Sequence, residues 1–134
     1  MIAKEFSVQT DEDSYNLSAS IRLIGEDVLV AIWGGERPHI GAVAVAQPRP
    51  SLKDPDLTSA STSVFCFVGH KEDELAKAAA EILSATLNTA VVVTAGIHWD
   101  NLDEEAILRI IKNSEILVDM ILEKCMAEFA DLNT

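Results

Sequence analysis

The sequence predicts a single α+β domain, built as a two-layer sandwich in which helices cover a mainly antiparallel sheet. The chain has 134 residues, which suffice for one hydrophobic core but not for two. Segments with the alternation of strands fill the first half, whereas the two segments with helical periodicity lie in the second half. The predicted order over the single domain, residues 1–134, is β-β-β-β-β-α-β-α.

The N-terminal part predicts three strands. Residues 3–9 alternate weakly and indicate a short edge strand. Tyr15–Ile24 alternates strongly and presents one apolar face, formed by Tyr15, Leu17, Ala19, Ile21 and Leu23. A tight turn at Gly25-Glu26-Asp27 then leads into Val28–Trp33, so these two segments predict a hairpin.

The next predicted strand, His39–Gln47, consists mostly of very small residues. It follows Gly34-Gly35 and Pro38, and it places Ile40, Ala42, Ala44 and Ala46 on one face. A surface this smooth lets another layer approach closely. The sequence leaves open whether that layer is a helix, a second sheet or a flat ligand.

The longest segment without periodicity is Pro48–Ala60, which holds three of the four prolines. Loops of this length in a small domain are usually functional or mobile. Ser61-Thr62-Ser63 then leads into Val64–Val68, which is apolar at every position and therefore predicts a central strand.

The remaining segments predict a helix, a buried strand and a second helix. The first helix, Glu72–Asn88, has an acidic first turn and an alanine-rich face. After the apolar strand Ala90–Ile97, Asn101 and Glu104 predict a capping box for a helix over about Asp103–Asp131. The expected apolar stripe of this last helix comprises Ile107, Ile110, Ile111, Leu117, Ile121, Leu122, Cys125 and Phe129. Leu108, Ile116, Val118 and Met120 extend the apolar surface beyond what one sheet face requires, which predicts a subunit interface and hence a homodimer or higher homo-oligomer.

Composition restricts the partners and the compartment. The net charge of −12 argues against nucleic acid and against an anionic membrane surface. The charge is uneven, because residues 34–71 contain four basic and three acidic side chains. The sequence shows neither a membrane span nor a signal peptide, so we expect a cytoplasmic protein. The two cysteines, Cys66 and Cys125, lack metal-type spacing and are expected in the core.

Two groups of polar residues predict a binding site. His39, His70 and His98 each lie beside a glycine where a strand meets a loop, and such strand ends commonly carry binding sites. Lys71 begins a helix, where a cation is unfavourable unless an anion lies nearby. Together with Arg49 and the hydroxyls of Ser61, Thr62 and Ser63, it could form a phosphate site.

A metal site is the competing interpretation of the same histidines. His39, His70 and His98 could converge on a metal ion, with Asp73 or Asp100 as a ligand or general base. Their spacing matches no known metal motif. No nucleophile is indicated, because Cys66 lies within a strand and no serine lies in a GxSxG turn. We therefore assign neither a catalytic residue nor a metal ligand.

Three segments resemble the family of prenylated-flavin chaperones: GGERPHIGAVAVAQPRPSL at 34–52, TSVFCFVGHKEDELA at 62–76 and AGIHWDNL at 95–102. The resemblance implies a non-catalytic accessory protein that binds prenylated FMN, or FMN itself. It implies a UbiD-type decarboxylase as the recipient of the cofactor, which a UbiX-type flavin prenyltransferase makes.

The residues that match this family suggest individual roles. Arg49, Lys71 and the hydroxyls of Ser61, Thr62 and Ser63 would contact the phosphate, and His39, His70 and His98 would contact the ring or its pyrimidine edge. Trp99 would stack on the isoalloxazine or would serve only the fold. Two other functions stay open at this point. One is a metal-dependent enzyme acting on a small organic acid, and the other is a purely structural decarboxylase subunit.

Overall fold

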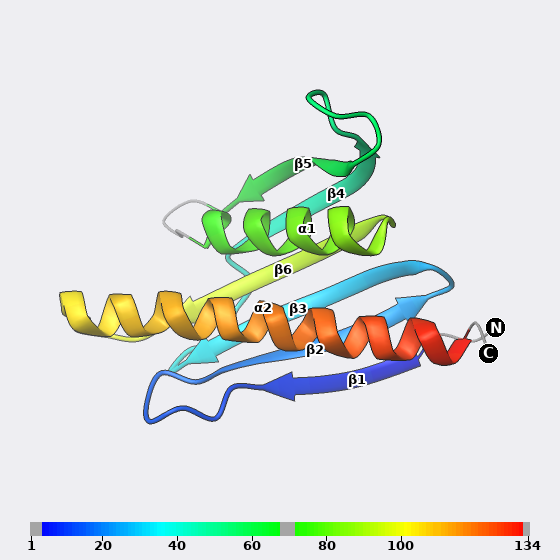
Figure 1. Ribbon diagram of the computed structural model, residues 1–134. Coiled ribbons are helices and arrows are strands. Elements are labelled where there is room, and N and C mark those ends of the chain that lie inside the picture. The colour runs from blue at the N-terminus through cyan, green and yellow to red at the C-terminus, as the bar shows by residue number, and fades with distance from the viewer. Residues whose placement is uncertain (1–3, 68–71, 133–134) are drawn as a thin grey trace.

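The structure, a computed structural model, describes residues 4–67 and 72–132, and it confirms the α+β sandwich and the predicted order of elements. The strands are β1 (Lys4–Gln9), β2 (Leu17–Ile24), β3 (Asp27–Gly35), β4 (Ala42–Pro50), β5 (Thr58–Cys66) and β6 (Val91–His98), and the helices are α1 (Asp73–Leu87) and α2 (Glu104–Leu132). The six strands form one sheet in the order β1-β2-β3-β6-β4-β5, and both helices lie on the same face of it (Figure 1).

The first three strands form the predicted antiparallel series. Ile24 pairs with Asp27 across a two-residue turn in which Gly25 has a φ of 61°, a conformation that glycine adopts without strain. The predicted inward face of β2 is confirmed from Leu17 to Leu23, whose side chains are fully buried at alternate positions. Tyr15 was wrongly included in this strand, because its φ of 58° places it in the turn before β2.

The order of the strands in the sheet does not follow their order in the chain. β6 lies between β3 and β4, parallel to β3 and antiparallel to β4. Its apolar run suits this position, since a strand with neighbours on both sides and a helix above it is largely removed from water. As a result, β3 and β4 are not paired, although they follow one another in the chain.

β4 and β5 form a hairpin that replaces most of the predicted loop over Pro48–Ala60. Only residues 51–57 lie outside the strands, and the backbone N–H of Ser51 donates to the carbonyl of Leu57. The prolines are tolerated because β4 pairs with β6 only as far as Ala46. The missing N–H groups of Pro48 and Pro50 therefore leave no gap in that ladder.

The predicted central position of Val64–Val68 was also wrong, because β5 is the edge strand of the sheet. The segment is apolar at successive positions, yet Phe65 is 63% exposed on the face that carries no helix. Apolar residues on both faces thus do not indicate burial here. They leave part of the helix-free face hydrophobic.

The helices divide the covered face between them. α1 packs over β4, β5 and β6 with Ala76, Ala79, Ala80 and Leu83 buried, and the alanines of β4 lie beneath it. The small-residue strand therefore receives a helix on its alanine face. α2 packs over β1 and β2, and Leu117, Ile121 and Cys125 of its predicted apolar stripe are buried.

The beginning of α2 differs from the prediction in two ways. Ile107 and Ile111, which we expected in the apolar stripe, are 45% and 50% exposed. The helix is capped by Asp103, whose carboxylate accepts a hydrogen bond from the Ala106 N–H at 2.8 Å, rather than by Asn101 and Glu104. Neither helix, as far as the structure describes them, is long and apolar enough to cross a membrane.

The two cysteines differ in burial. Cys125 is fully buried, and burial raises the pKa of its thiol to about 11, whereas Cys66 on the edge strand is only half-buried. The expectation of core cysteines is confirmed for Cys125 alone.

The segment from β3 to β4 must cross β6, and glycines make the crossing possible. After Gly35 the chain runs over the end of β6, where the backbone of His39 lies directly against Gly96. A Cβ atom on Gly96 would overlap the carbonyl oxygen and carbon of His39. Since these are backbone atoms, no side-chain rotation could relieve the overlap.

This predicts a specific sensitivity at Gly96. Gly96→Ala should lower the free energy of unfolding in urea by at least about 2 kcal/mol more than Gly25→Ala does. Gly25 is the matched control, because a Cβ atom there meets open space and costs only the left-handed φ, about 1–2 kcal/mol. Equal losses in the two variants would show that the crossing is not close-packed at Gly96.

Candidate functional site

The candidate site lies where residues 36–41 cross the end of β6. The Glu36 N–H donates to the His98 carbonyl at 2.8 Å, and the Gly41 N–H donates to the Ala95 carbonyl at 2.9 Å. The crossing segment is thus fixed to β6 at both of its ends. It brings His39 close to the C-terminal end of β6, where His98 lies.

Glu72 fixes the other side of this crossing. Its carboxylate, whose side chain is only 10% exposed, accepts a hydrogen bond from the Ile97 N–H at 3.2 Å. The carboxylate thereby takes the place of the strand partner that Ile97 lacks on the β4 side. A Cβ atom on Gly41 would overlap the same carboxylate, so a side chain there would displace the Glu72 side chain from this position.

His39 is held through both of its ring nitrogens. Nδ1 lies 2.9 Å from the carbonyl oxygen of Arg37, and Nε2 lies 3.0 Å from a carboxylate oxygen of Glu72. The ring orientation is therefore set by the crossing segment and by the start of α1.

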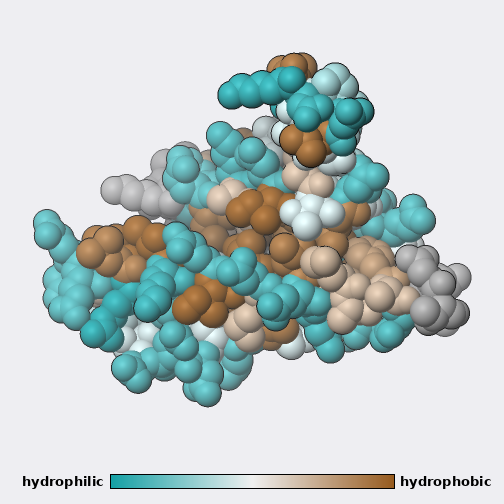
Figure 2. All heavy atoms as spheres, viewed as in Figure 1, coloured by the Kyte–Doolittle hydropathy of each residue, from teal (hydrophilic) through white to brown (hydrophobic). Residues whose placement is uncertain are grey.

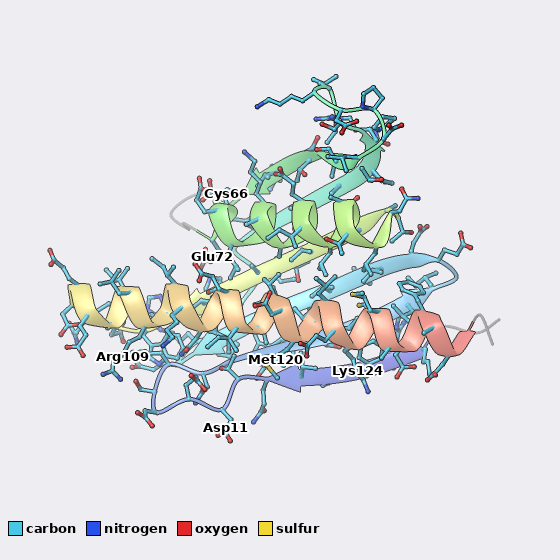
Figure 3. All side chains as sticks on the ribbon, viewed as in Figure 1. Asp11, Cys66, Glu72, Arg109, Met120 and Lys124 are labelled. Carbon is cyan, nitrogen blue, oxygen red and sulfur yellow. The ribbon has the colours of Figure 1, made fainter. Side chains whose placement is uncertain are left out.

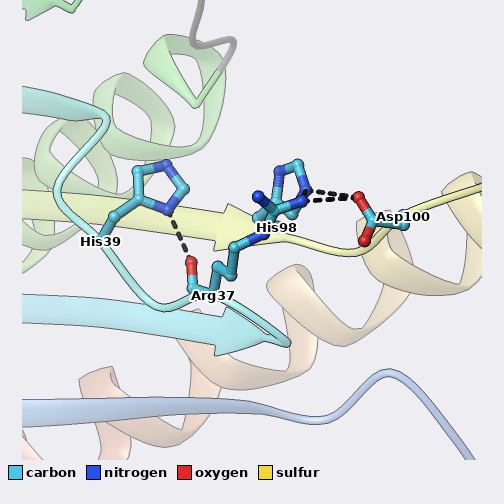
Figure 4. Close-up of polar contacts among 4 residues, drawn as sticks. All are labelled: Arg37, His39, His98 and Asp100. Atoms are coloured by element: carbon cyan, nitrogen blue, oxygen red, sulfur yellow. Dashed lines mark hydrogen bonds and ion pairs between the residues drawn. The ribbon is translucent and has the colours of Figure 1, made fainter.

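His98 belongs to a second polar group at the same end of the sheet, with Arg37 and Asp100 (Figure 4). Asp100 Oδ1 lies 2.9 Å from His98 Nε2 and 2.8 Å from Arg37 Nη2, and Arg37 Nη2 lies 2.9 Å from His98 Nε2. Nε2 can donate to Asp100 or accept from Arg37, but it cannot do both at once. The hydrogen bond from His98 and the nearby Arg37 guanidinium hold the pKa of Asp100 below its ordinary value.

Trp99 points into the fold next to this group. It packs partly buried against the core, and its ring meets Tyr15 edge to face with the centroids 5.1 Å apart. A structural role for Trp99 is thus visible. Stacking on a ligand stays a prediction.

Arg49 and the three hydroxyl residues lie elsewhere, in the β4–β5 hairpin. Arg49 Nε donates to Ser61 Oγ at 2.9 Å. Ser61 and Ser63 are exposed on the helix-free face, whereas Thr62, which pairs with Ala46, points to the helix face. Because Arg49 is near the end of β4 and His39 precedes its start, the two residues lie at opposite ends of that strand (Figure 1).

His70 and Lys71 lie outside the described residues. Their described neighbours, Phe67 and Glu72, border the start of β4: the Phe67 N–H donates to the Gly41 carbonyl, and Glu72 contacts His39. Within residues 4–67 and 72–132, no group of three or more His, Cys, Asp or Glu side chains is arranged to hold a metal ion. The three-histidine hypothesis also needs His70, so this observation does not test it.

Sequence reasoning missed two residues of this region. Arg37 was counted only as part of the charge balance, although it lies two residues before His39 in the same turn. Glu72 was interpreted as an acidic residue at a helix start. Its contact with Ile97 depends on how far β4 extends along β6, which no local pattern reveals.

Comparisons with known proteins identify relatives of the chain. The profile of a protein family described as "Prenylated flavin chaperone LpdD-like domain" matches residues 11–126. Protein LpdD of Lactiplantibacillus plantarum (strain ATCC BAA-793 / NCIMB 8826 / WCFS1) is 26% identical over 98 residues, which cover 73% of this chain and 68% of that protein.

The fold is also similar to a solved structure described as a novel chaperone complex for yeast 20S proteasome assembly. The TM-score is 0.52, the identity is 16%, and the match covers 98% of both chains. At this identity the similarity concerns the fold alone.

The polar group predicts a pH-dependent contact. In NMR titrations Asp100 should stay ionised to a lower pH than an isolated aspartate, and His98→Ala should raise its pKa toward the ordinary value. Because the folded pKa is lowered, the stabilisation by this carboxylate is present above the ordinary pKa and is lost as the pH falls through the folded value. Arg109→Ala is the control, since Arg109 contacts Ser14 and Glu105 instead. An Asp100 pKa that is the same in the His98→Ala variant would contradict the assignment.

Proposed function

Because the chain belongs to the family of prenylated flavin chaperones with an LpdD-like domain, we propose that it binds prenylated FMN, or FMN itself, and delivers it to a UbiD-type decarboxylase. The recipient would carry out the chemistry, and this chain would only hold the cofactor. A UbiX-type prenyltransferase would supply the modified flavin, and the chain would act as a homodimer or higher homo-oligomer.

The site that best supports this proposal is the crossing at the end of β6. A flavin mononucleotide needs donors and acceptors for its pyrimidine edge, apolar surface for its rings and a cation for its phosphate. The crossing offers His98 as a hydrogen-bonding group, an exposed Ile40 as apolar surface and an exposed Arg37 guanidinium. The side chains present therefore fit the chemical requirements of this cofactor.

We assign the histidines and Trp99 to the ring end of the cofactor. His98 would contact the pyrimidine edge directly, and His70 would add a contact from the adjoining segment. His39, fixed by Arg37 and Glu72, would mainly orient the crossing segment beside the ring. Trp99 would stack on the isoalloxazine with the part of its indole that does not contact Tyr15.

The phosphate has two possible positions, which are far apart. A strand rises about 3.3 Å per residue, so Ala42 and Arg49 are separated by roughly 23 Å. Arg49 and Ser61 could bind an anion at the hairpin, but that anion would be remote from His39 and His98. We propose that the phosphate binds at the crossing, to Arg37 with Lys71, and we treat Arg49 with Ser61 and Ser63 as the competing position, from which Thr62 is separated because it lies on the other face of β5.

An anaerobic titration of the protein with prenylated FMN, FMN and riboflavin, followed by absorbance, tests this assignment. Arg37→Ala should weaken FMN binding at least tenfold, because a charge-assisted hydrogen bond contributes about 1.5–3 kcal/mol. Riboflavin, which has no phosphate, should bind equally to the wild type and to this variant.

Arg49→Ala is the matched control, since it removes the same functional group at the other end of β4. FMN binding should be unchanged in Arg49→Ala. If FMN affinity instead falls in Arg49→Ala and not in Arg37→Ala, the phosphate position must be assigned to the hairpin. If neither flavin nor prenylated flavin binds and the purified protein instead holds stoichiometric metal, the carrier function is wrong and the metal-dependent enzyme takes its place.

A further inference from the structure

An apolar groove lies between α1 and α2, on the face of the molecule that carries the helices. Its volume is about 860 Å³, and its apolar lining comes from both helices and from the residues before α2. The apolar lining includes Leu75, Ile82, Ile97, Ile107, Ile111 and Val118. Figure 2 shows hydrophobic atoms gathered in a band between the two helices, bordered by hydrophilic ones.

The groove is open to solvent where its largest apolar side chains lie. Ile82 of α1 is 46% exposed, and Ile107 and Ile111, which lie one turn apart on α2, are 45% and 50% exposed. Ile107 and Ile111 belong to the apolar stripe that the sequence predicted for α2, and here they line the groove. Exposed isoleucines gathered in one groove are unusual for a free surface and are typical of a place where a partner binds.

The charges around the groove all have the same sign. Glu72, Glu74, Glu115 and Asp119 belong to its lining, and none of the described lining residues is basic. The cations of α2 lie on its other side: Arg109 contacts Ser14, Lys112 lies beside Glu12 and Asp13, and Lys124 lies over the Phe6 ring. Figure 3 shows Arg109 and Lys124 on the side of α2 away from α1.

This distribution selects among the possible occupants. A flavin phosphate would be repelled by four carboxylates, and a second copy of a chain with a net charge of −12 would place carboxylates against carboxylates. A helix with an apolar face flanked by lysines or arginines fits both the floor and the border of the groove. We propose that the groove is the docking site for a basic amphipathic helix of a partner protein.

This proposal does not depend on the identity of the cofactor, although the two surfaces adjoin. Glu72 and Ile97 both line the groove. Glu72 contacts His39, and Ile97 directly precedes His98 in the chain. A helix bound in the groove would therefore end beside the proposed flavin site.

The proposal is tested with a fluorescently labelled helical peptide of about five turns, which carries a Leu/Ala face flanked by lysines. Its counterpart has the same apolar face flanked by glutamates. Fluorescence anisotropy with the full chain should show binding of the lysine peptide and at least tenfold weaker binding of the glutamate peptide, and the binding should weaken with added salt.

Two pairs of variants locate the binding. The double variant Glu115→Lys/Asp119→Lys should bind the lysine peptide at least tenfold more weakly than the wild type. The control double variant Glu81→Lys/Glu123→Lys changes the net charge by the same amount outside the groove lining and should bind the peptide as the wild type does. Ile111→Asp should abolish binding, whereas Leu108→Asp, at an exposed apolar position of the same helix outside the groove lining, should not.

Three outcomes would overturn the proposal. The first is equal binding of the lysine and glutamate peptides. The second is an equal loss of affinity for the lysine peptide in a groove variant and in its control variant. The third is failure of the lysine peptide to bind while Ile111→Asp converts a dimer to a monomer in light scattering, which would assign the groove to a second copy of the chain.

Discussion

The chain that leaves β3 reaches β4 only by crossing β6, and the crossing is possible because Gly96 has no side chain. Several other features depend on this one contact. Glu36 and Gly41 bind the backbone of β6 on either side of it, and His39 lies between them. Beyond the crossing, Ile97 has no strand partner on the β4 side, so the Glu72 carboxylate closes the edge and holds the His39 ring. The polar groups that we propose bind a cofactor are thus brought together because β6 lies between β3 and β4, which follow one another in the chain.

The proposed cofactor site and the proposed docking groove carry opposite charges. An exposed guanidinium, Arg37, lies at the crossing, whereas the groove between the helices combines isoleucines with carboxylates. In a chain with a net charge of −12, an anionic cofactor and a basic partner helix would be drawn to different surfaces. Because Ile97 borders the groove and His98 belongs to the crossing, these surfaces still adjoin at the end of β6. This arrangement suits a protein that holds a ligand while it contacts a recipient.

Local patterns predicted the elements well, but the sheet order depends on contacts that the patterns do not contain. The alternation from Leu17 to Leu23 predicted which face of β2 is buried, and the alanines of α1 predicted close packing on the sheet. Val64 and Phe65 look like a buried strand, yet they lie on an edge because β6 pairs with the other side of β4. Burial at such positions is decided by which strands become neighbours.

The candidate site was predicted in part for the same reason. His39 and His98 were recognised from their glycine neighbours, and both lie at the crossing. The assignment of His39 and Arg49 to one binding site is harder to reconcile with the fold, because the extended strand β4 lies between the two residues. Arg37 and Glu72 had ordinary local explanations, and only the path of the chain over Gly96 gives them further contacts.

Hydrogen exchange at the Ile97 amide tests most directly whether Glu72 closes the edge of β6 in place of a strand. In Glu72→Ala, Ile97 should lose most of its protection, while Val93, buried in the centre of the same strand, should keep its own. Glu72→Gln, which retains an acceptor oxygen, should preserve much of the protection at Ile97. Unchanged exchange of Ile97 in Glu72→Ala would show that the edge is closed by another group, and the account of the crossing would be wrong.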